Sequence, residues 1–477
     1  MPVDLDELFD AMRRRADTVP LRGAAHARAR GRHRDRVRAV MTVAVVVAVV
    51  AVGTGFAVRG PAVRHDQPAM PAVGSPLLLD GVPTDARIVT DGDRAYVAWT
   101  RPDNDSVWVA ATDLRTGAVA WAPQRLSQPD ASEALAEVLL TPSAVVVVTK
   151  PRVDPPNGFM FYLLDRATGA LDDAVAGDNS PEGGSDQGKE DWVFAGDQMV
   201  TMQPSGQIFF SGVAGEGYNG YTSGDPLYAR LLGWGTTADE KTVSQSGPSA
   251  AFTDSRVVLV TVDGTADVFD ARRGKKLRTV RLGLVSGKQM AVFDGVLSMV
   301  DPHDSPTGPQ RLRFVDVSGG NGGAWETAPI PGAVVAMSGC GPGRVCAVTS
   351  VAGRKDQITA FDVRQRRVAW QATTEVTGAA QLSVANGRAL VAGTGGFDLY
   401  DPDGRRTVTG STAFHGVWLD PQQLLVERPE GVLARLPIGD REPTPIGRVP
   451  AGTRSCASTS TRLVCLAATT VTTWEVR

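Results

Sequence analysis

Trp108-Val-Ala-Ala-Thr-Asp113-Leu-Arg-Thr-Gly117-Ala-Val-Ala-Trp121 is the stretch that decides the fold of this chain. A related stretch, Ile358-Thr-Ala-Phe-Asp362-Val-Arg-Gln-Arg-Arg-Val-Ala-Trp370, follows much later. The underlying unit is an apolar run, a Gly/Pro/Asp turn and a second apolar run ending in Asp. It recurs about nine times, at a period of about 35–58 residues. Since one such unit cannot bury its apolar faces alone, this period predicts a repeat architecture.

Each unit contains a candidate hairpin, formed by its predicted second and third strands. The nine candidates are 94–99 with 107–111, 144–149 with 160–164, 198–202 with 207–210, 256–262 with 266–269, 296–300 with 312–315, 344–349 with 358–361, 388–392 with 397–400, 423–426 with 432–436, and 463–467 with 471–474. Many are rich in Val on both faces, as expected of strands covered on both sides by neighbouring sheets. Asn386-Gly387, Asp263-Gly264 and Asp294-Gly295 are strong turn signals between strands.

These patterns predict an all-β fold, a β-propeller of four-stranded blades. We expect about eight blades, with a range of seven to nine, because 212–245 matches the repeat poorly and reads as a long insertion loop. Residues 176–191 read as a second polar loop. The chain ends in a third strand without a fourth, and 76–79 are expected to supply that strand and close the ring. A parallel β-helix is the rival architecture.

A single apolar span precedes the repeats. Residues 39–58 carry no charge and are long enough to cross a bilayer as a helix; the alternative is a cleaved signal peptide. Arginines cluster before the span, which predicts a cytoplasmic N-terminus and an extracellular C-terminal domain. The expected division is therefore 1–38, cytoplasmic amphipathic helix and Arg-rich segment; 39–58, transmembrane helix; 59–75, linker; and 76–477, propeller.

Two further properties bear on partners. Residues 59–477 hold 39 Lys or Arg against 46 Asp or Glu, a balance that argues against nucleic-acid binding. Residues 1–20 form an amphipathic pattern that would dock on a cytosolic regulator, such as a sigma factor, or only set topology and touch anionic lipid.

The four cysteines fall in two close pairs, Cys340/Cys346 and Cys456/Cys465. Four cysteines allow three connectivities. Local pairing is favoured because a turn lies within each pair, so that each would face across a hairpin at a separation suited to a disulfide. Disulfides persist in oxidising compartments, which agrees with an extracytoplasmic body. The alternative is four reduced, buried thiols, and zinc is disfavoured by the spacings.

The units resemble the tryptophan-docking repeats of PQQ-like (quinoprotein alcohol dehydrogenase-like) propellers. The resemblance rests on Ala-x-Asp-x-x-Thr-Gly-x-x-x-Trp, matched nearly in full by the unit that contains Asp113, Gly117 and Trp121 and partly by the others. The partial matches are Asp165 with Gly169, Asp270 with Gly274, Asp362 with Trp370, and Asp401 with Gly404. In physical terms these residues hold turns and fill space between blades. The whole layout also resembles membrane-anchored actinobacterial propeller proteins.

Catalytic chemistry is not apparent in the sequence. The resemblance implies a quinone with calcium and often adjacent cysteines, but the chain has no Cys-Cys pair and no recognisable calcium ligand set. Asp91-Gly-Asp93 and Asp401-Pro-Asp403 read as turns. His65, His303 and His415 stand apart, without a nucleophile signature. We therefore predict no catalytic residue, cofactor or metal. The expected function is a non-catalytic, membrane-tethered scaffold or sensor that binds an extracytoplasmic protein, peptide or glycan. The alternative is a divergent quinoprotein-type or hydrolytic enzyme with a site at the propeller centre.

Overall fold

The structure is a computed structural model of the 477-residue chain. The described residues are 70–101, 106–126, 133–151, 159–177, 191–202, 208–212, 219–221, 228–236, 251–261, 263–283, 289–301, 308–319, 323–351, 354–376, 378–393, 396–411, 417–428, 432–440, 442–448 and 453–476. The chain divides into Met1–Asp66, which lies outside these residues, and Gln67–Arg477, which holds every described strand. No helix among the described residues is long and apolar enough to cross a membrane, and the predicted span at 39–58 lies outside them.

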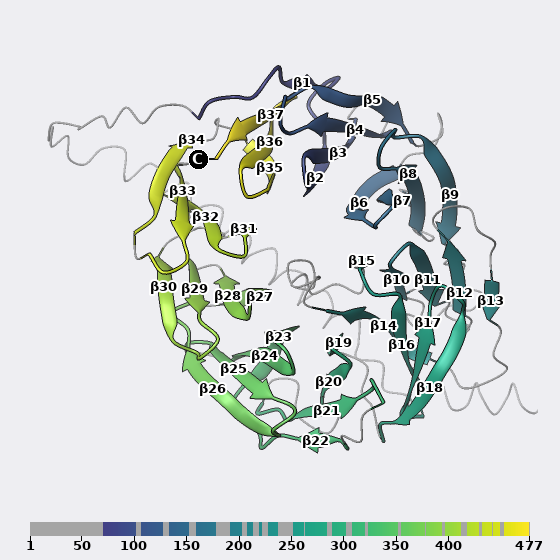
Figure 1. Cartoon of the computed structure of the whole chain (residues 1–477), viewed down its shortest axis with the longest axis vertical. Helices are drawn as coiled ribbons and strands as arrows, with labels where there is room; N and C mark the ends of the chain where they lie inside the picture. Colours follow the sequence, from purple (N-terminus) through teal and green to yellow (C-terminus); the bar gives the residue numbers. More distant parts are fainter. Residues whose placement is uncertain are drawn as a thin grey trace, which may run out of the picture. The chain divides into compact units, whose positions relative to one another are not determined.

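The strands of the body form four-stranded antiparallel sheets arranged around a centre, and we call them blades (Figure 1). Blade 1 is β2 (Asp85–Asp91), β3 (Arg94–Thr100), β4 (Val107–Asp113) and β5 (Val119–Arg125). Blade 2 is β6 (Glu133–Leu140), β7 (Ala144–Pro151), β8 (Phe159–Asp165) and β9 (Leu171–Gly177). Blade 3 is β10 (Asp191–Ala195), β11 (Gln198–Met202), β12 (Ile208–Gly212) and β13 (Asn219–Tyr221). Blade 4 is β14 (Tyr228–Gly235), β16 (Arg256–Thr261), β17 (Thr265–Asp270) and β18 (Lys275–Arg281).

The remaining blades follow the same plan. Blade 5 is β19 (Met290–Phe293), β20 (Val296–Val300), β21 (Leu312–Asp316) and β22 (Trp325–Glu326). Blade 6 is β23 (Ala333–Gly339), β24 (Arg344–Ser350), β25 (Gln357–Asp362) and β26 (Arg367–Thr373). Blade 7 is β27 (Ala379–Ala385), β28 (Arg388–Gly393), β29 (Gly396–Tyr400) and β30 (Arg406–Ser411). Blade 8 is β31 (Val417–Asp420), β32 (Gln423–Arg428), β33 (Val432–Pro437) and β34 (Thr444–Arg448). Blade 9 is β35 (Thr453–Ser458), β36 (Arg462–Ala467), β37 (Thr470–Glu475) and β1 (Leu77–Leu78).

The first strand of each blade lies toward the centre and the fourth lies at the outer edge (Figure 1). Blades 4 and 5 form one continuous sheet, because β14 and β19 pair in parallel at Trp234–Val292 and Gly235–Phe293. The short strand β15 (Ala251–Phe252) pairs in parallel with β10 on its central side.

Blade 9 joins the two ends of the repeat region. Leu77 pairs with Val471 and Leu78 with Thr470, so an early strand completes the last blade. The pairing continues at Ala72 and Trp474, and the backbone N–H of Val73 donates to Thr473 O at 2.8 Å. We call residues 70–79 the closing segment. The prediction that 76–79 supply the fourth strand of the last blade is confirmed, and the pairing begins earlier than expected.

Apolar side chains on both faces of the strands explain why the blades stack. Val145 and Val147 pack with blade 1, whereas Val146 and Val148 pack with blade 3. All four side chains are fully buried. Each hydrophobic cluster among the described residues joins one blade to the next, and the series runs from blade 1 through to blade 9 and back. Burial on both faces therefore holds the ring together, as the Val-rich strands predict.

All nine predicted hairpins are present as paired strands in the described part of the chain. Asn386-Gly387 and Asp294-Gly295 form two-residue turns with positive φ at all four residues, which is the geometry these sequences favour. Because each hairpin forms the middle of its own run of four antiparallel strands, nine blades can be traced in the described residues, six as separate sheets, blade 3 with β15 added, and blades 4 and 5 joined. The number lies at the top of the predicted range, and the central expectation of eight was one too low.

The stretch 212–245 accounts for that difference. The prediction of a long insertion loop was wrong for its described parts, since 219–221 form β13 and 228–235 form β14. Leu231, Leu232 and Trp234 of β14 are buried against blades 3 and 5. The Gly and Tyr residues around β14 are typical of a loop, and composition therefore did not predict this strand. For the polar loop predicted at 176–191, residues 178–190 lie outside the described residues, and its ends belong to β9 and β10.

Candidate functional site

The repeated aspartates hold the turns between third and fourth strands. Asp113 Oδ1 accepts hydrogen bonds from the backbone N–H groups of Arg115 and Thr116, each at 2.9 Å. Asp165 Oδ1 repeats this with Ala167 N at 3.0 Å and Thr168 N at 2.7 Å. The Thr168 hydroxyl and these N–H groups lower the pKa of Asp165, because they stabilise its charged form.

The other predicted turn aspartates have the same role. Asp270 accepts from Arg272 N at 3.1 Å, and Asp362 accepts from Gln365 N at 2.9 Å. Asp401 accepts from the backbone N–H groups of Asp403 and Arg405, so Asp401-Pro-Asp403 is a turn, as predicted.

The repeated tryptophans dock onto the next blade. A Cβ placed on Gly169 would lie 2.5 Å from Trp121 Cδ2, so the indole of blade 1 rests on the glycine of blade 2. Trp370 of blade 6 rests in the same way on Gly404 of blade 7, where a Cβ would lie 2.4 Å from the indole. Gly274 lies beside Phe210 of blade 3, at 3.4 Å from such a Cβ to the ring.

Gly117 has a different neighbour. A Cβ there would lie 1.8 Å from Val73 O, so Gly117 lies directly against the closing segment. The predicted repeat residues are thus all found at junctions or turns of the ring.

One residue that packs on the next blade was not predicted from the sequence, because it is an arginine and not an aromatic residue. Arg278 pairs with Val268, two residues before Asp270, as Trp121 pairs with Ala111, two residues before Asp113. Its guanidinium donates to Ser318 O of blade 5 and lies against Gly319. Arg278 therefore takes the tryptophan position, and the spacing of eight residues from the turn aspartate is the signal that identifies it.

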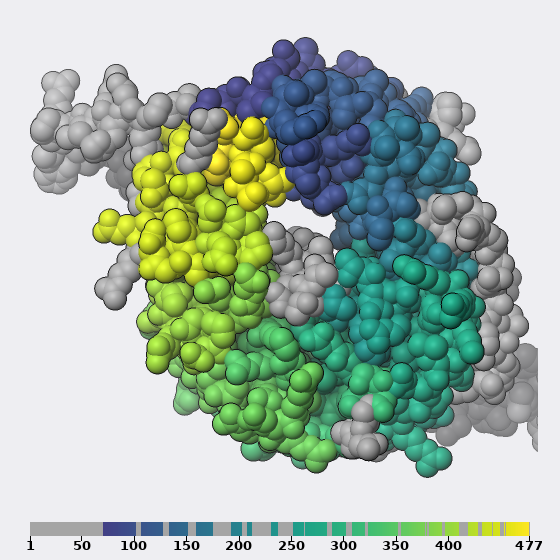
Figure 2. All heavy atoms as spheres, viewed as in Figure 1, coloured from purple at the N-terminus to yellow at the C-terminus, as the bar shows by residue number. Residues whose placement is uncertain are grey.

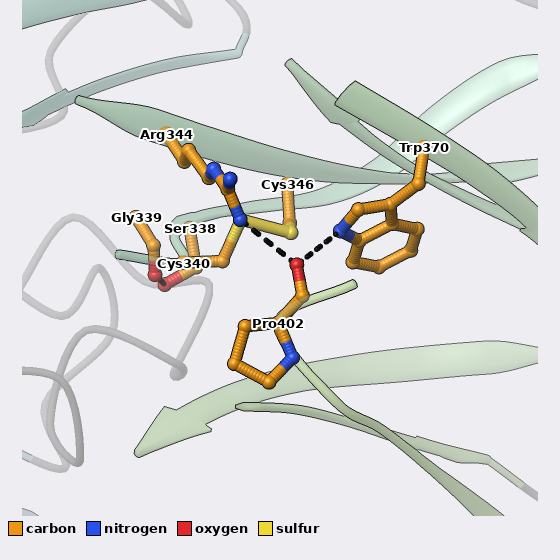
Figure 3. Close-up of a disulfide and its surroundings, with 7 residues drawn as sticks. All are labelled: Ser338, Gly339, Cys340, Arg344, Cys346, Trp370 and Pro402. Carbon is orange, nitrogen blue, oxygen red and sulfur yellow. Dashed lines mark hydrogen bonds between the residues drawn. A yellow bond between two sulfur atoms is a disulfide. The ribbon is translucent and has the colours of Figure 1, made fainter. Parts of the chain in front are cut away.

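A second missed residue is an arginine at the start of several second strands. Arg94 Nη1 donates to Arg166 O at 2.5 Å, and Arg462 Nε donates to Leu114 O at 3.0 Å. Arg344 Nη1 donates to Pro402 O at 2.8 Å, and the same oxygen accepts from Trp370 Nε1 at 3.0 Å (Figure 3). In each case the acceptor oxygen belongs to the residue directly after the turn aspartate of the next blade, so the hydrogen bond joins neighbouring blades.

Both predicted disulfides are present in the structure. Cys340–Cys346 joins the end of β23 to β24, with its Cα atoms 5.6 Å apart. Cys456 and Cys465 lie directly opposite each other on β35 and β36, with a Cα separation of 4.1 Å. Both bridge the first and second strands of a blade, as predicted. Arg344 lies between Cys340 and Cys346 in the sequence, so this disulfide closes the turn from which Arg344 reaches blade 7 (Figure 3).

Figure 2 shows an opening near the centre of the body, bordered in part by atoms of blades 9, 1 and 2. Arg87 lies on β2 and Glu137 on β6, the inner strands of blades 1 and 2. Arg87 Nη1 donates to Asp85 Oδ1 at 2.8 Å. Burial raises the pKa of Glu137 to about 7, and the positive charge of Arg87 opposes that rise.

Two polar clusters are buried, one within blade 2 and one in blade 7. Glu133, 5% exposed, accepts from Thr149 Oγ1 at 2.6 Å and from Tyr162 OH at 2.9 Å. Asp398, fully buried, accepts at Oδ2 from Glu375 N at 2.6 Å and from Tyr400 OH at 3.3 Å. Burial, together with the neighbouring carboxylate, raises the pKa of both tyrosines. In these positions the hydroxyls act as hydrogen-bond donors that stabilise buried carboxylates.

No group of three or more His, Cys, Asp or Glu side chains that could hold a metal ion occurs among the described residues. His303 and His415 lie outside them.

The chain matches no protein-family model and no curated protein. Among solved structures, it is similar to BamB from Moraxella catarrhalis, with 16% identity, a TM-score of 0.44 and coverage of 86% of this chain and 98% of that one. It is also similar to the C-terminal WD40 domain of Sif2, with 10% identity, a TM-score of 0.42 and coverage of 86% and 99%. The Dos1 propeller gives 8% identity, a TM-score of 0.43 and coverage of 85% and 95%. These are similarities of fold.

Proposed function

We propose that this protein is a membrane-tethered extracytoplasmic propeller that acts as a binding scaffold or sensor for a protein, peptide or glycan. The observation that supports it most is where the repeated residues lie. Asp113, Asp165, Trp121, Trp370 and their equivalents form turns or dock blades. They hold the ring together, and a rigid ring of this kind is suited to presenting a binding surface.

The predicted arrangement in the cell places 39–58 in the membrane and the propeller outside it. The two disulfides agree with an oxidising compartment. This arrangement is tested by adding a membrane-impermeant protease to intact cells that express the full chain. We expect the propeller to be cleaved or released while a tag at residue 1 stays protected. Protection of both ends would overturn the proposed topology.

The binding function is tested by mild crosslinking in the native membrane, affinity purification of the full chain and mass spectrometry. We expect a reproducible extracytoplasmic partner. A parallel purification of a full chain lacking residues 1–20 identifies any cytosolic regulator, because that partner alone should disappear. Recovery of no partner after crosslinking, and no thermal shift with a glycan panel, would contradict the proposed function.

A second candidate is a hydrolytic enzyme with its site at the propeller centre. Glu137 favours it, because a carboxyl with a pKa of about 7 beside an arginine is suited to general acid–base work. Screening the full chain and its Glu137→Gln variant against a panel of ester, peptide and glycoside substrates tests this candidate. Turnover that the variant loses would support it, and no turnover by the unaltered chain would contradict it.

A further inference from the structure

The outer edge of blade 4 carries an unusual concentration of positive charge. Residues 271–282, Ala-Arg-Arg-Gly-Lys-Lys-Leu-Arg-Thr-Val-Arg-Leu, hold six cations and no acid, although 59–477 as a whole are net acidic. The exposed cations are Arg272, Arg273, Lys275, Lys276 and Arg281. They lie on the turn before β18 and along β18 itself.

This edge differs from the equivalent edges of other blades. The corresponding stretch of blade 2, residues 166–177, has one arginine and two aspartates, and that of blade 1, residues 114–125, has two arginines. Because all three are fourth strands of the same repeat, the charge on β18 is not a requirement of the fold.

Several of these cations are not used in holding the fold. Lys276 forms an ion pair with Asp267 at 3.1 Å, and Arg278 is used in docking on blade 5. Arg273 lies 3.8 Å from Asp270 and its side chain is 79% exposed, which makes a weak pair. Lys275 and Arg281 form no ion pair with any described residue.

The backbone of β18 also has an open side. Within the described residues β18 pairs with β17 alone and ends the order of its sheet, so its outer N–H and C=O groups face away from blade 4. Leu277, on the same strand, is 44% exposed. An open strand edge can receive another extended chain by main-chain hydrogen bonds, with side chains setting the specificity.

We propose that the β18 edge binds an acidic peptide segment of a partner protein, which adds to blade 4 as a further antiparallel or parallel strand. Main-chain hydrogen bonds would hold the peptide in place. Lys275 and Arg281, near the two ends of β18, would meet its carboxylates, and Leu277 would meet an apolar side chain between them. This deepens the proposed binding function and rests on it, by naming the surface and the chemistry of the partner.

The competing explanation is that the charges only prevent edge-to-edge association of copies of this chain, as lysines on edge strands do elsewhere. The two explanations differ in a measurable way. Protection requires only that charge be present, whereas recognition requires that an acidic strand bind to this edge in preference to other cationic sites.

The test is titration of the purified full-length chain with a fluorescent twelve-residue peptide of alternating Glu and Val. We expect saturable binding that weakens as salt rises. Lys275→Glu with Arg281→Glu should weaken binding about tenfold or more, since two attractive pairs become repulsive. The matched control is Arg354→Glu with Arg405→Glu, two exposed arginines outside blade 4, which should leave binding within about twofold. Circular dichroism and thermal unfolding confirm that both variants fold.

Four results would overturn the proposal. The first is equal binding of a peptide with alternate N-methylated residues, because it cannot pair along a strand edge. The second is equal loss with the control variant. The third is self-association of the β18 variant without any peptide binding by the unaltered chain, which would support protection instead. A crosslinked partner retained by the β18 variant in membranes would overturn this inference while leaving the proposed binding function intact.

Discussion

The indole of Trp121 in blade 1 lies against the α-carbon of Gly169 in blade 2, so closely that a Cβ at Gly169 would lie 2.5 Å from the ring. The glycine is required twice. Its φ is +75°, a region that favours glycine, and its missing side chain is the space that the tryptophan fills. Trp370 packs on Gly404 in the same way. Each of these two junctions between blades therefore requires a residue without a Cβ.

Gly169→Ala should therefore destabilise the protein more than backbone strain alone can explain. Gly92 provides the matched control, because its φ is +54° and no atom lies within 4 Å of the position that a Cβ would take. We expect Gly92→Ala to cost about 1 kcal/mol and Gly169→Ala about 2–4 kcal/mol, the difference coming from overlap with the indole. Chemical denaturation monitored by tryptophan fluorescence measures both. Equal costs would show that the docking contact is not tight.

Leu77 and Leu78 test the closing segment. They are adjacent on β1, yet Leu77 is 5% exposed and Leu78 is 69% exposed. Leu77→Ala should lower the free energy of unfolding by about 2–3 kcal/mol, because it leaves a cavity between blades 9 and 1. Leu78→Ala should change it by less than about 0.5 kcal/mol. Thermal unfolding of the full chain compares them, and similar shifts would mean that β1 does not occupy this register.

Arg344 and the neighbouring disulfide should act together. Arg344→Met removes the hydrogen bond to Pro402 O while keeping most of the side-chain volume, at an expected cost of about 1–2 kcal/mol. Cys340→Ser with Cys346→Ser should cost about 2 kcal/mol. Because the disulfide closes the turn that presents Arg344, the combined variant should lose at least about 0.5 kcal/mol less than the sum. Denaturation of all four proteins gives this coupling, and strict additivity would refute it.

Glu137 predicts a pH dependence. Its folded-state pKa of about 7 lies above the unfolded value of 4.5, so the folded protein binds more protons between these values. Stability should then be greatest below about pH 4.5 as far as this group is concerned, and should fall as pH rises toward 7. We expect this fall to be about 1–2 kcal/mol, allowing for partial exposure.

Glu137→Gln should remove that part of the pH dependence and stabilise the protein at pH 8. The control is Glu442→Gln, an exposed side chain on blade 8, which makes the same change of charge away from β6. Denaturation midpoints at a series of pH values provide the measurement. A profile unaltered by Glu137→Gln would show that this carboxyl does not carry the effect.

Arg366 occupies the position that Gly117 and Gly169 hold in other blades, four residues after the turn aspartate, and its φ is +52°. Arg366→Gly should relieve the strain and raise stability by up to about 1 kcal/mol, despite the loss of its hydrogen bond to Gly323 O. Arg364→Gly, two residues earlier and without positive φ, should instead lower stability by about 0.5–1 kcal/mol. Calorimetry of the two variants distinguishes these outcomes, and the same sign for both would contradict the prediction.

The fold was predictable from the sequence because its signal is repeated. Asp113, Gly117 and Trp121 show one unit nearly complete, and the hairpins recur with turn residues such as Asn386-Gly387 between them. The blade count was harder, since β14 combines apolar residues with Gly233 and Gly235 among Tyr- and Gly-rich neighbours. A single sequence does not reveal that such a strand is buried from both sides.

Contacts between blades were predicted less well than contacts within them. Trp121 and Trp370 were identified because tryptophan at this place has a known packing role. Arg278 has the same place but another chemistry, and it was missed. The arginines that begin second strands, Arg94 and Arg344 among them, recur visibly in the sequence, but their acceptors are backbone carbonyls. Every residue has a backbone carbonyl, so the sequence does not show which carbonyl accepts a hydrogen bond from a given arginine. Only the folded chain shows these partners.

The closing segment also has a consequence for how the chain is made. Leu77 cannot pair with Val471 until that residue, which follows it by 394 residues, has been synthesised. At about 5–20 residues per second, the ribosome takes about 20–80 s to produce the partner after the segment itself has emerged. During that time blade 1 lacks its neighbour in blade 9, and the apolar side chains that the two blades bury together, such as Ile88 and Val97, remain uncovered. Synthesis of β37 thus ends the period in which this apolar surface is exposed to aggregation, and a truncation near residue 470 would leave that surface exposed permanently.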